Sequence, residues 1–245
     1  TVRYWAFPHM NPIQQEPKVN LNLSGVYKIN SIDVSDDDQL IMFTTGSPEI
    51  QLFNETGLKK GETRRGDMYV YDKSHTFGHT HEVTCAQFKP YDKDQFASIS
   101  EDGSIRFWDT NKLQDSKLFI RLNGKGESLN PGKYLVYSPD GGGVYTVATD
   151  YSIKFWNPDV PNILSIPQLK IRTPNRISTI AVANDGYHVA GRLEDEGFVL
   201  MYDIRNTNQA VFTFEADSNL PSICFSPDSK YLLVPEIVHP RSRQG

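Results

Sequence analysis

The sequence predicts an all-β fold built from a repeated unit of antiparallel strands. The first observation behind this prediction is a short segment that occurs five times with a β-branched residue first and an aromatic residue fourth. The aromatic column consists of Trp5, Phe53, Trp108, Trp156 and Tyr202, at intervals of 48, 55, 48 and 46 residues. The copies are VRYWA (2–6), IQLFN (50–54), IRFWD (105–109), IKFWN (153–157) and VLMYD (199–203). A fixed period of this length is typical of repeat architectures.

The second observation is that strand-like sequence and turn residues keep step with these segments. Apolar residues alternate with polar ones, and this period of two indicates strands. Ser-Pro-Asp or Asn-Asp-Gly separates two such stretches in several copies, which is turn chemistry. The stretches are SIDVSDDDQLIMFTTG (31–46), CAQFKPYDKDQFASIS (85–100), YLVYSPDGGGVYTVAT (134–149), TIAVANDGYHVAG (179–191) and SICFSPDSKYLLV (222–234). About four strands in roughly 45 residues predict the blade of a β-propeller.

The composition narrows the function classes. The chain has 245 residues, a net charge of −5 and a pI near 5.7, so a broad basic surface for nucleic acid is not expected. Two cysteines are too few for a disulfide framework, which favours a reducing compartment. No apolar run approaches the roughly 18 residues of a membrane span, and the start has no signal-peptide pattern. The first residue is not Met, so we expect a portion of a longer chain.

The third copy, FGHTHEVTCAQFKPYDKDQFASISEDGSIRFWDTN (77–111), resembles a complete WD repeat. It has Gly78-His79 near its start and Trp108-Asp109 near its end. The resemblance implies a hydrogen-bonded network of His79, Ser98 or Ser100, Asp102 and Trp108, which fixes the strands of the blade in register. It also implies a WD-repeat β-propeller of about seven blades. The chain then supplies four complete blades at about 25–216 and two partial blades, all within a single domain, 1–245.

Three histidines and a cysteine within eleven residues, His75, His79, His81 and Cys85, pose the question of a zinc site. The WD resemblance gives His79 a structural role instead. Successive strand residues point to opposite faces, so convergence of all four side chains on one ion is geometrically poor. We therefore expect no metal and no other cofactor.

Other copies depart from the family pattern. The fourth copy keeps Asp150 and Trp156 but has no Gly-His before it. The second copy has Phe53-Asn54 in place of Trp-Asp and is followed by the segment ETGLKKGETRRGD (55–67), which we expect to be an additional loop. The full network is therefore expected in the third blade alone.

Two surface segments are candidates for partner binding. LMYDIRN (200–206) resembles the ending of WD repeats that dock the adaptor of cullin-four ubiquitin ligases, with Asp203 and Arg205 matching and Tyr202 in place of Trp. The alternative is that Arg205 is merely solvated or pairs within its own blade. The 55–67 loop offers a basic patch for a weak contact with nucleic-acid phosphates, and HPRSRQ (239–244) is a weaker one. The alternative is that the 55–67 loop is merely solvated. The cations of this loop are Lys59, Lys60, Arg64 and Arg65.

No motif indicates catalysis. PDGGGV (139–144) lacks the Lys and Ser or Thr of a phosphate-binding loop, and DVSDDDQ (33–39) lacks calcium-loop spacing, so both are predicted to be hairpin turns. The sequence therefore predicts a non-catalytic scaffold that binds other proteins.

The order of VRYW, GLKKGETRRGDMYVYD, GHTHEV and MYDIR resembles one subfamily of WD-repeat proteins. That resemblance implies a nuclear protein linked to chromatin, the DNA-damage response and ubiquitin ligation, as a substrate receptor of a cullin-four ligase. The alternative is a scaffold in a spliceosomal or other ribonucleoprotein complex, and an enzyme with its site at the propeller channel is a third reading.

Overall fold

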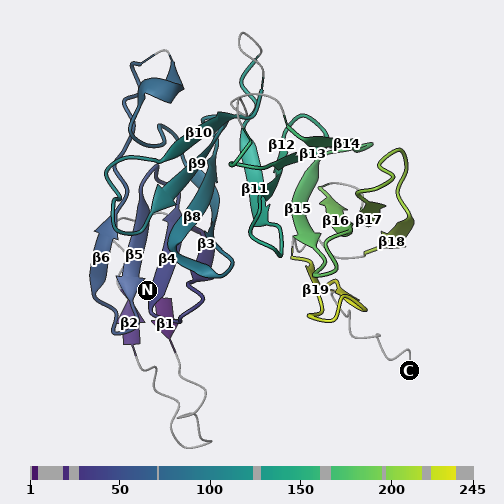
Figure 1. The fold of residues 1–245 in the computed structure, drawn as a ribbon, viewed down its shortest axis with the longest axis horizontal. Coiled ribbons are helices and arrows are strands. Elements are labelled where there is room, and N and C mark those ends of the chain that lie inside the picture. Colours follow the sequence, from purple (N-terminus) through teal and green to yellow (C-terminus); the bar gives the residue numbers. More distant parts are fainter. Residues whose placement is uncertain are drawn as a thin grey trace, which may run out of the picture.

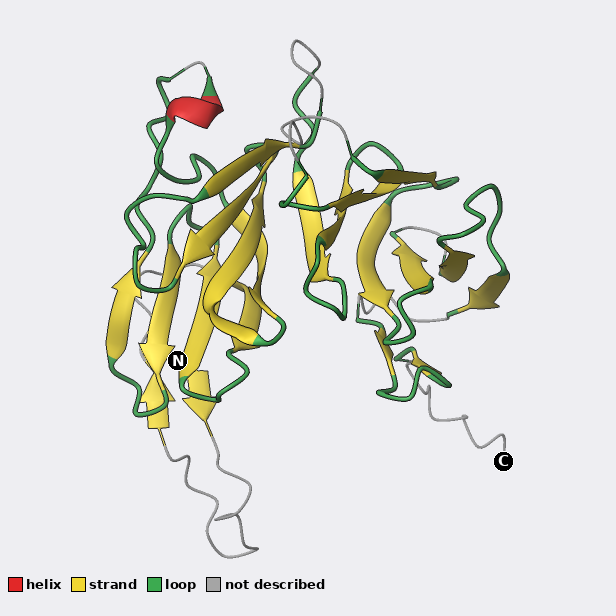
Figure 2. Ribbon diagram, viewed as in Figure 1, coloured by secondary structure: helices red, strands yellow, loops and turns green. Residues whose placement is uncertain are grey.

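The computed structural model of this chain consists almost entirely of β-strands and their connections (Figure 2). The single helix in the part of the chain that it describes is one 3-10 turn, η2 (Lys73–His75). Within the same residues, no helix has the length and apolar character needed to cross a membrane. The described residues are 2–4, 19–21, 28–70, 72–123, 128–160, 167–194, 197–216 and 222–235.

Four antiparallel sheets of four strands each follow one another along the chain, and we number them by the repeat copy to which they belong. Sheet 2 comprises β3 (Ile29–Val34), β4 (Leu40–Thr45), β5 (Ile50–Asn54) and β6 (Lys59–Glu62). Sheet 3 comprises β7 (Val83–Lys89), β8 (Asp92–Ser100), β9 (Ser104–Asp109) and β10 (Leu118–Arg121). Sheet 4 comprises β11 (Gly132–Tyr137), β12 (Val144–Ala148), β13 (Ser152–Trp156) and β14 (Leu169–Arg172). Sheet 5 comprises β15 (Ile177–Val182), β16 (His188–Leu193), β17 (Phe198–Asp203) and β18 (Phe212–Glu215).

Two-stranded sheets flank these four. Sheet 1 pairs β1 (Val2–Tyr4) with β2 (Val19–Leu21), and sheet 6 pairs β19 (Cys224–Phe225) with β20 (Leu232–Leu233). The partial units expected at both ends are therefore present. Trp5, the aromatic residue of the first copy, lies outside the described residues.

The turns between first and second strands are closed by a recurrent Ser-x-Asp contact. The hydroxyl of Ser138 donates to Asp140 at 2.5 Å, and its backbone N–H donates to the carbonyl of Gly143 at 2.9 Å. Gly141 has a φ of +69°, which is accessible to glycine at little cost. The hydroxyl of Ser35 donates to Asp37 in the same way at 2.7 Å. The predictions that 139–144 and 33–39 form hairpin turns are thus confirmed.

Consecutive sheets pack face to face through separate apolar clusters. The cluster between sheets 3 and 4 joins Ile99 and Ile105 to Leu135 and Trp156, and comparable clusters lie between the other successive sheets. The first strands β3, β7, β11, β15 and β19 contact one another in that order. Figure 1 shows β11, β15 and β19 following one another. Sheets that succeed one another around a common set of inner strands form a β-propeller. The predicted fold class is confirmed, whereas seven blades and a single domain stay predictions.

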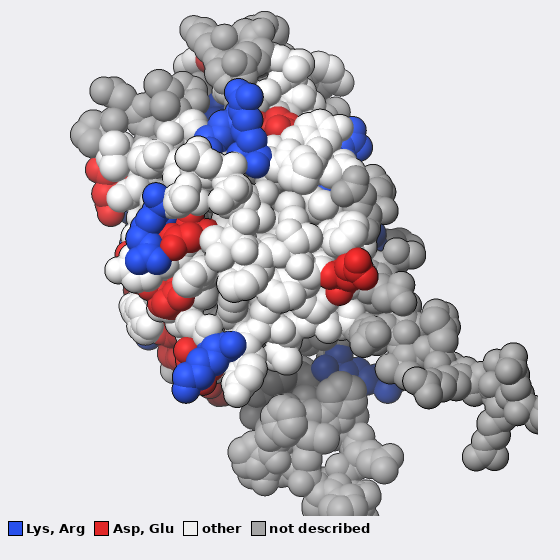
Figure 3. All heavy atoms as spheres, turned by 90° about the vertical axis from the view of Figure 1, so that its right-hand side faces the viewer, with Lys and Arg blue, Asp and Glu red and all other residues white. Residues whose placement is uncertain are grey.

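The edges of this arrangement carry exposed apolar side chains. All four residues of β18 are exposed, with Phe212 at 55% and Phe214 at 41%. On that side of the molecule, charged residues are scattered among large uncharged areas (Figure 3). Exposed strand edges of this kind are aggregation liabilities unless something covers them.

The expectation that 55–67 forms a loop is only partly right. Lys59–Glu62 form β6, the outer strand of sheet 2, which pairs with β5. KKGE lacks the apolar alternation of a buried strand, because an outer edge strand packs few side chains against the core. The residues that lengthen this repeat lie farther on, in the connection 63–82 that contains η2.

Candidate functional site

Four polar side chains in sheet 3 form a continuous hydrogen-bonded chain. The indole N–H of Trp108 donates to Ser98 Oγ at 2.8 Å, and Ser98 Oγ lies 2.8 Å from His79 Nε2. On the other side of the ring, His79 Nδ1 lies 3.0 Å from Asp102 Oδ2. The imidazole is completely buried. The WD resemblance placed these residues in one network, and the structure brings them together.

The network is consistent with a neutral imidazole. Burial lowers the pKa of His79, and Asp102 only partly opposes this shift. With Nδ1 protonated, His79 donates to Asp102 and accepts the proton of Ser98 at Nε2, so every group has one role. The pKa of Asp102 is lowered although burial opposes it, because His79, Ser104 and the Thr80 N–H all donate to its oxygens. The carboxylate is therefore ionised and saturated with donors.

Ser98 rather than Ser100 is the hydroxyl of the network. Ser100 Oγ instead donates to the carbonyl of His81 at 3.1 Å and accepts from the backbone N–H of Asp102. Ser104 is an additional member, since its hydroxyl donates to Asp102 at 2.5 Å. The position of Ser104 two residues after Asp102, with Gly103 between them, is the sequence signal that could have identified it.

A buried cation two residues before the tryptophan was not predicted from the sequence. Arg106 is 1% exposed, and its guanidinium donates to the carbonyls of Lys73 and Thr76 at 2.8 and 2.9 Å. Burial lowers its pKa to about 10, which still leaves it charged at neutral pH. Lys154 holds the corresponding position in sheet 4, where it donates to the carbonyl of Leu122 and pairs with Asp150. Both cations fix the connection that leads into their own sheet.

Sheet 4 retains part of the network without the histidine. The indole of Trp156 donates to Thr146 Oγ1 at 2.9 Å, as Trp108 does to Ser98. Asp150 accepts from Ser152 at 2.9 Å and pairs with Lys154 at 2.7 Å. The buried Asn130 accepts from Thr149 in the connection before this sheet. Sheet 3 alone has the His-centred version in the described part of the chain.

The residues considered for zinc lie in separate environments. His75 is exposed on η2 near Asp72, and His81 is exposed with its Nδ1 next to the hydroxyl of Thr80. The thiol of Cys85 is buried and donates to the carbonyl of Leu135 in sheet 4. Burial raises the pKa of this thiol to about 11. Among the described residues, no group of three or more His, Cys, Asp or Glu side chains is placed to hold a metal ion.

The Asp203–Arg205 pair stands at the end of β17. Three hydrogen bonds join the guanidinium to the carboxylate, at 2.9, 3.1 and 2.6 Å, and the guanidinium stacks on the ring of Tyr187 at 4.5 Å. The hydrogen bonds from Arg205 lower the pKa of Asp203 to about 2. Arg205 is therefore held within its own blade, yet 62% of its side chain stays exposed. Tyr202 is buried in the sheet core.

The four cations of 55–67 have different surroundings. Lys59 pairs with Glu62 at 2.6 Å, and Arg64 stacks on the ring of Phe77 at 4.5 Å. Arg65 contacts the sulfur of Met68, and Lys60 is exposed on β6. They do not form one compact basic cluster around a common ligand. The weaker basic segment, 239–244, lies outside the described residues.

Comparison with known proteins agrees with these features. The family described as "WD domain, G-beta repeat" matches residues 71–109, which contain the His79 network. Over 236 residues, and 95% of this chain, the sequence is 25% identical to "WD repeat-containing protein 70" of Xenopus laevis. It is 26% identical to the human protein of the same name over 242 residues, and 24% identical to "Gastrulation defective protein 1 homolog" of Drosophila melanogaster over 238 residues, each match covering 95% of this chain.

The match covers only part of each relative. The chain spans 38% of the length of the Xenopus laevis relative and 36% of the other two. The subfamily resemblance that the order of motifs indicated is thus to WD repeat-containing protein 70, and it extends over nearly all of this chain. The chain contains a WD repeat within repeated β-sheets, and this family implies a scaffold for protein interactions.

Proposed function

We propose that this chain is the interaction domain of a nuclear substrate receptor for a cullin-four ubiquitin ligase, acting in chromatin maintenance and the DNA-damage response. Apolar clusters join successive sheets, and buried hydrogen bonds fix their connections. Binding residues on such a scaffold lie on its loops while the strands hold them in place. The relatives extend well beyond the matched region, so the activity of the whole protein is part of this proposal.

The arrangement around Arg205 carries the proposal. Asp203 orients the guanidinium, and Tyr187 supports one of its faces, so the side chain is fixed before a partner arrives. A preorganised arginine loses little entropy on binding and presents a planar fork of donors. Its exposed fraction of 62% leaves the outward face accessible to carboxylates or carbonyls of an adaptor. Arginines of this kind are frequent hot spots in protein interfaces.

Pull-down of the purified ligase adaptor by wild type and by Arg205→Ala tests the proposal. We expect the variant to keep its fold by circular dichroism and to lose about 2 kcal/mol or more of binding free energy. Arg205→Lys should bind almost as weakly, because an ammonium cannot reproduce the planar fork.

Arg176→Ala is the matched control, since Arg176 is also exposed and lies over a tyrosine ring, that of Tyr151. This variant should bind like wild type. Equal recovery of the adaptor by the wild type, Arg205→Ala and Arg176→Ala would exclude the docking role.

A scaffold role in a spliceosomal or other ribonucleoprotein complex is the second candidate. The exposed cations Lys60 and Arg65 favour it, because they could approach phosphate groups. The other two cations support this role less well, because Lys59 already pairs with Glu62 and Arg64 already stacks on Phe77. Affinity purification of the full-length protein distinguishes the two candidates, since ligase subunits favour the first and splicing factors the second.

A further inference from the structure

A groove of about 650 Å³ runs between the outer strand of sheet 2 and the turn that follows β9 of sheet 3. Strand β6 forms one wall, and the turn 110–115 forms the other. Polar and charged side chains predominate in this lining. The lining residues are Lys60, Gly61, Glu62, Thr110, Asn111, Lys112, Leu113, Gln114 and Asp115.

The β6 wall has backbone groups that no strand of its sheet uses. The N–H of Thr63 donates to Ile50 of β5, so Glu62 belongs to a non-hydrogen-bonded pair and its N–H and C=O point away from β5. Two residues on, along the same edge, the N–H of Arg64 donates to the carbonyl of Leu113 at 3.1 Å. The turn 110–115 therefore already occupies this edge at Arg64. An extended segment could pair with the remaining outward groups of the edge, at Glu62.

The opposite wall has a buried hydroxyl without a partner. Thr110 is 2% exposed, and its Oγ1 has no hydrogen-bond partner in the described part of the chain. Burial of an unpaired hydroxyl is unfavourable, so this wall retains an unsatisfied polar atom. Gly61 lets the side chain of Leu113 approach β6 closely, because a Cβ at this position would lie 2.9 Å from Leu113 Cδ1.

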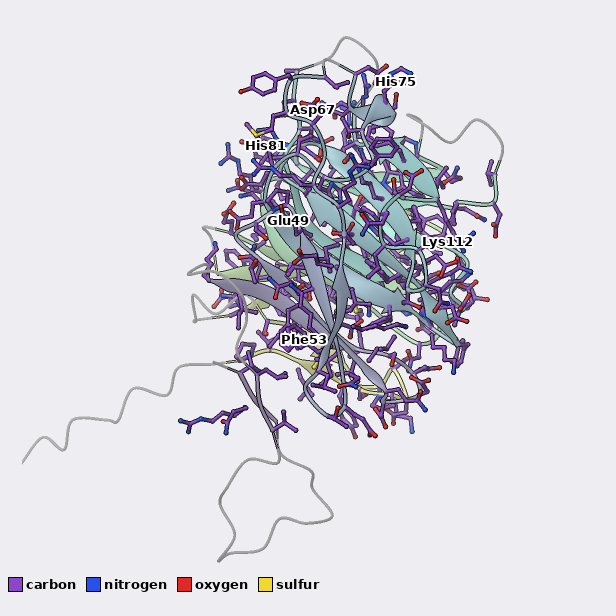
Figure 4. All side chains as sticks on the ribbon, turned by 90° about the vertical axis from the view of Figure 1, so that its left-hand side faces the viewer. Glu49, Phe53, Asp67, His75, His81 and Lys112 are labelled. Carbon is purple, nitrogen blue, oxygen red and sulfur yellow. The ribbon has the colours of Figure 1, made fainter. Side chains whose placement is uncertain are left out.

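The charges at the groove favour an acidic ligand. Glu62 is already paired with Lys59 at 2.6 Å. Lys60 and Lys112 lie on opposite walls and have no ion pair in the part of the chain that the structure describes. Asp115 is the remaining acidic side chain of the lining. Figure 4 looks onto this side of the molecule and shows Lys112 near the margin of the face.

We propose that this groove binds an extended acidic peptide segment of a protein partner by strand addition to β6. The peptide backbone pairs with the free groups at Glu62, and its carboxylates contact Lys60 and Lys112. A peptide fits better than a nucleic acid, since the free edge requires a peptide backbone and no aromatic side chain lines the groove for base stacking. The inference rests on the interaction function proposed above, but it uses a different surface from Arg205.

Fluorescence anisotropy with a capped peptide of alternating glutamate and threonine residues tests this inference on the 245-residue chain. We expect wild type to bind this probe and to bind a lysine–threonine peptide at least about tenfold more weakly. Reversal of both lysines, Lys60→Glu with Lys112→Glu, should lower affinity for the acidic probe by about tenfold or more. The matched control reverses Lys93 and Lys230, exposed lysines that pair with Asp37 and Asp228 elsewhere on the surface, and it should bind like wild type.

A second pair of variants isolates the backbone contact. Glu62→Pro removes the outward N–H, which an edge strand tolerates, and Glu62→Thr removes only the carboxylate. We expect the proline variant to lose binding and the threonine variant to keep it, with circular dichroism confirming that both are folded. An N-methylated form of the probe should also fail to bind.

Three results would overturn the inference: no binding of the acidic probe by wild type, equal binding of the N-methylated probe, or tighter binding of a single-stranded oligonucleotide that the double lysine variant loses. The docking test on Arg205 is unaffected by these outcomes, so failure here is distinguishable from failure of the proposed function.

Discussion

Replacement of Asp33 by asparagine should stabilise the protein at neutral pH. Asp33 lies on β3 and its Oδ2 accepts the backbone N–H of Phe88, on β7 of the next sheet, at 2.6 Å. Burial raises the pKa of this carboxyl from 3.8 to about 6, although the backbone N–H groups of Phe88 and Val34 oppose the shift. Gln87 performs the same contact one sheet further on, where its Oε1 accepts the N–H of Tyr137 at 2.7 Å. A neutral amide is therefore sufficient for this role.

The magnitude follows from the change in pKa. A rise from 3.8 to about 6 corresponds to about 3 kcal/mol, since each pKa unit is worth about 1.4 kcal/mol. Asp33 is partly exposed, so solvent screening reduces the expected gain to about 1–2 kcal/mol. The nearby titratable groups, Cys85 and Tyr134, offer no compensating positive charge. Burial raises their pKa values to about 11 and about 12, which keeps both neutral.

The pH dependence gives the sign of the effect. The folded-state pKa lies above the unfolded value, so the contribution of Asp33 to stability is fully present below about pH 4 and is lost as pH rises through about 6. Asp33→Asn should therefore exceed wild type in free energy of unfolding at pH 7.5, with a smaller difference at pH 4.5.

Urea denaturation followed by tryptophan fluorescence measures both values. Asp36→Asn is the matched control, because the exposed Asp36 also accepts a backbone N–H from sheet 3, that of Tyr91. This variant should change the free energy of unfolding little. Equal destabilisation by Asp33→Asn at both pH values would refute the reasoning.

Three further predictions concern the third sheet, the connection leading to it and the cations of 55–67. His79→Ala should lower the free energy of unfolding by about 1–3 kcal/mol, because Ser98 and Asp102 lose a buried partner. A chelator should leave the melting temperature of wild type unchanged, and a clear drop in that temperature would restore the zinc hypothesis. Arg106→Met should cost about 1–3 kcal/mol and expose η2 to faster hydrogen exchange, since buried carbonyls lose their donor; unchanged exchange would contradict the anchoring role. Replacement of the four cations of 55–67 by Glu should hardly change the melting temperature. If the segment binds nucleic acid, the slope of log affinity against log salt concentration should fall in magnitude by about one for each lost phosphate contact. Unchanged binding by the variant, or no binding by wild type, would mean that the segment is merely solvated.

The sheets were predictable because the aromatic column and the period-two alternation report directly on core packing. Trp108, Trp156 and Tyr202 are all buried at the places where the repeat put them. The turns were predictable because Ser, Asp and Gly are required there by hydrogen bonding and backbone geometry. The members of the His79 network came from the WD resemblance, because no spacing rule joins residues 79 and 108 without the fold.

The missed features are those in which tertiary contacts override local sequence signals. Strand β6 has the sequence KKGE, and its pairing with β5 comes from the edge of an existing sheet. Arg106 and Lys154 alternate with apolar neighbours as exposed strand residues would, yet both are buried. Their burial depends on carbonyl groups of two connections that are distant in sequence, at Lys73, Thr76 and Leu122. No local pattern contains that information.

The Gly-His pair at the start of the third repeat combines a backbone requirement with a side-chain requirement. A Cβ on Gly78 would lie 1.7 Å from the carbonyl oxygen of Arg64, so no side chain fits there while the incoming connection keeps its path. One residue later, the carbonyl of His79 accepts the N–H of Gly66 at 2.8 Å, and its ring enters the network of the sheet. Gly78 therefore lets residues 64–66 approach, and His79 joins that segment to the core of sheet 3. Since Arg64 also donates its N–H to Leu113, the same contacts position the turn 110–115 beside β6, where the peptide groove lies. The motif that defines the repeat thus also fixes the geometry of a surface outside it.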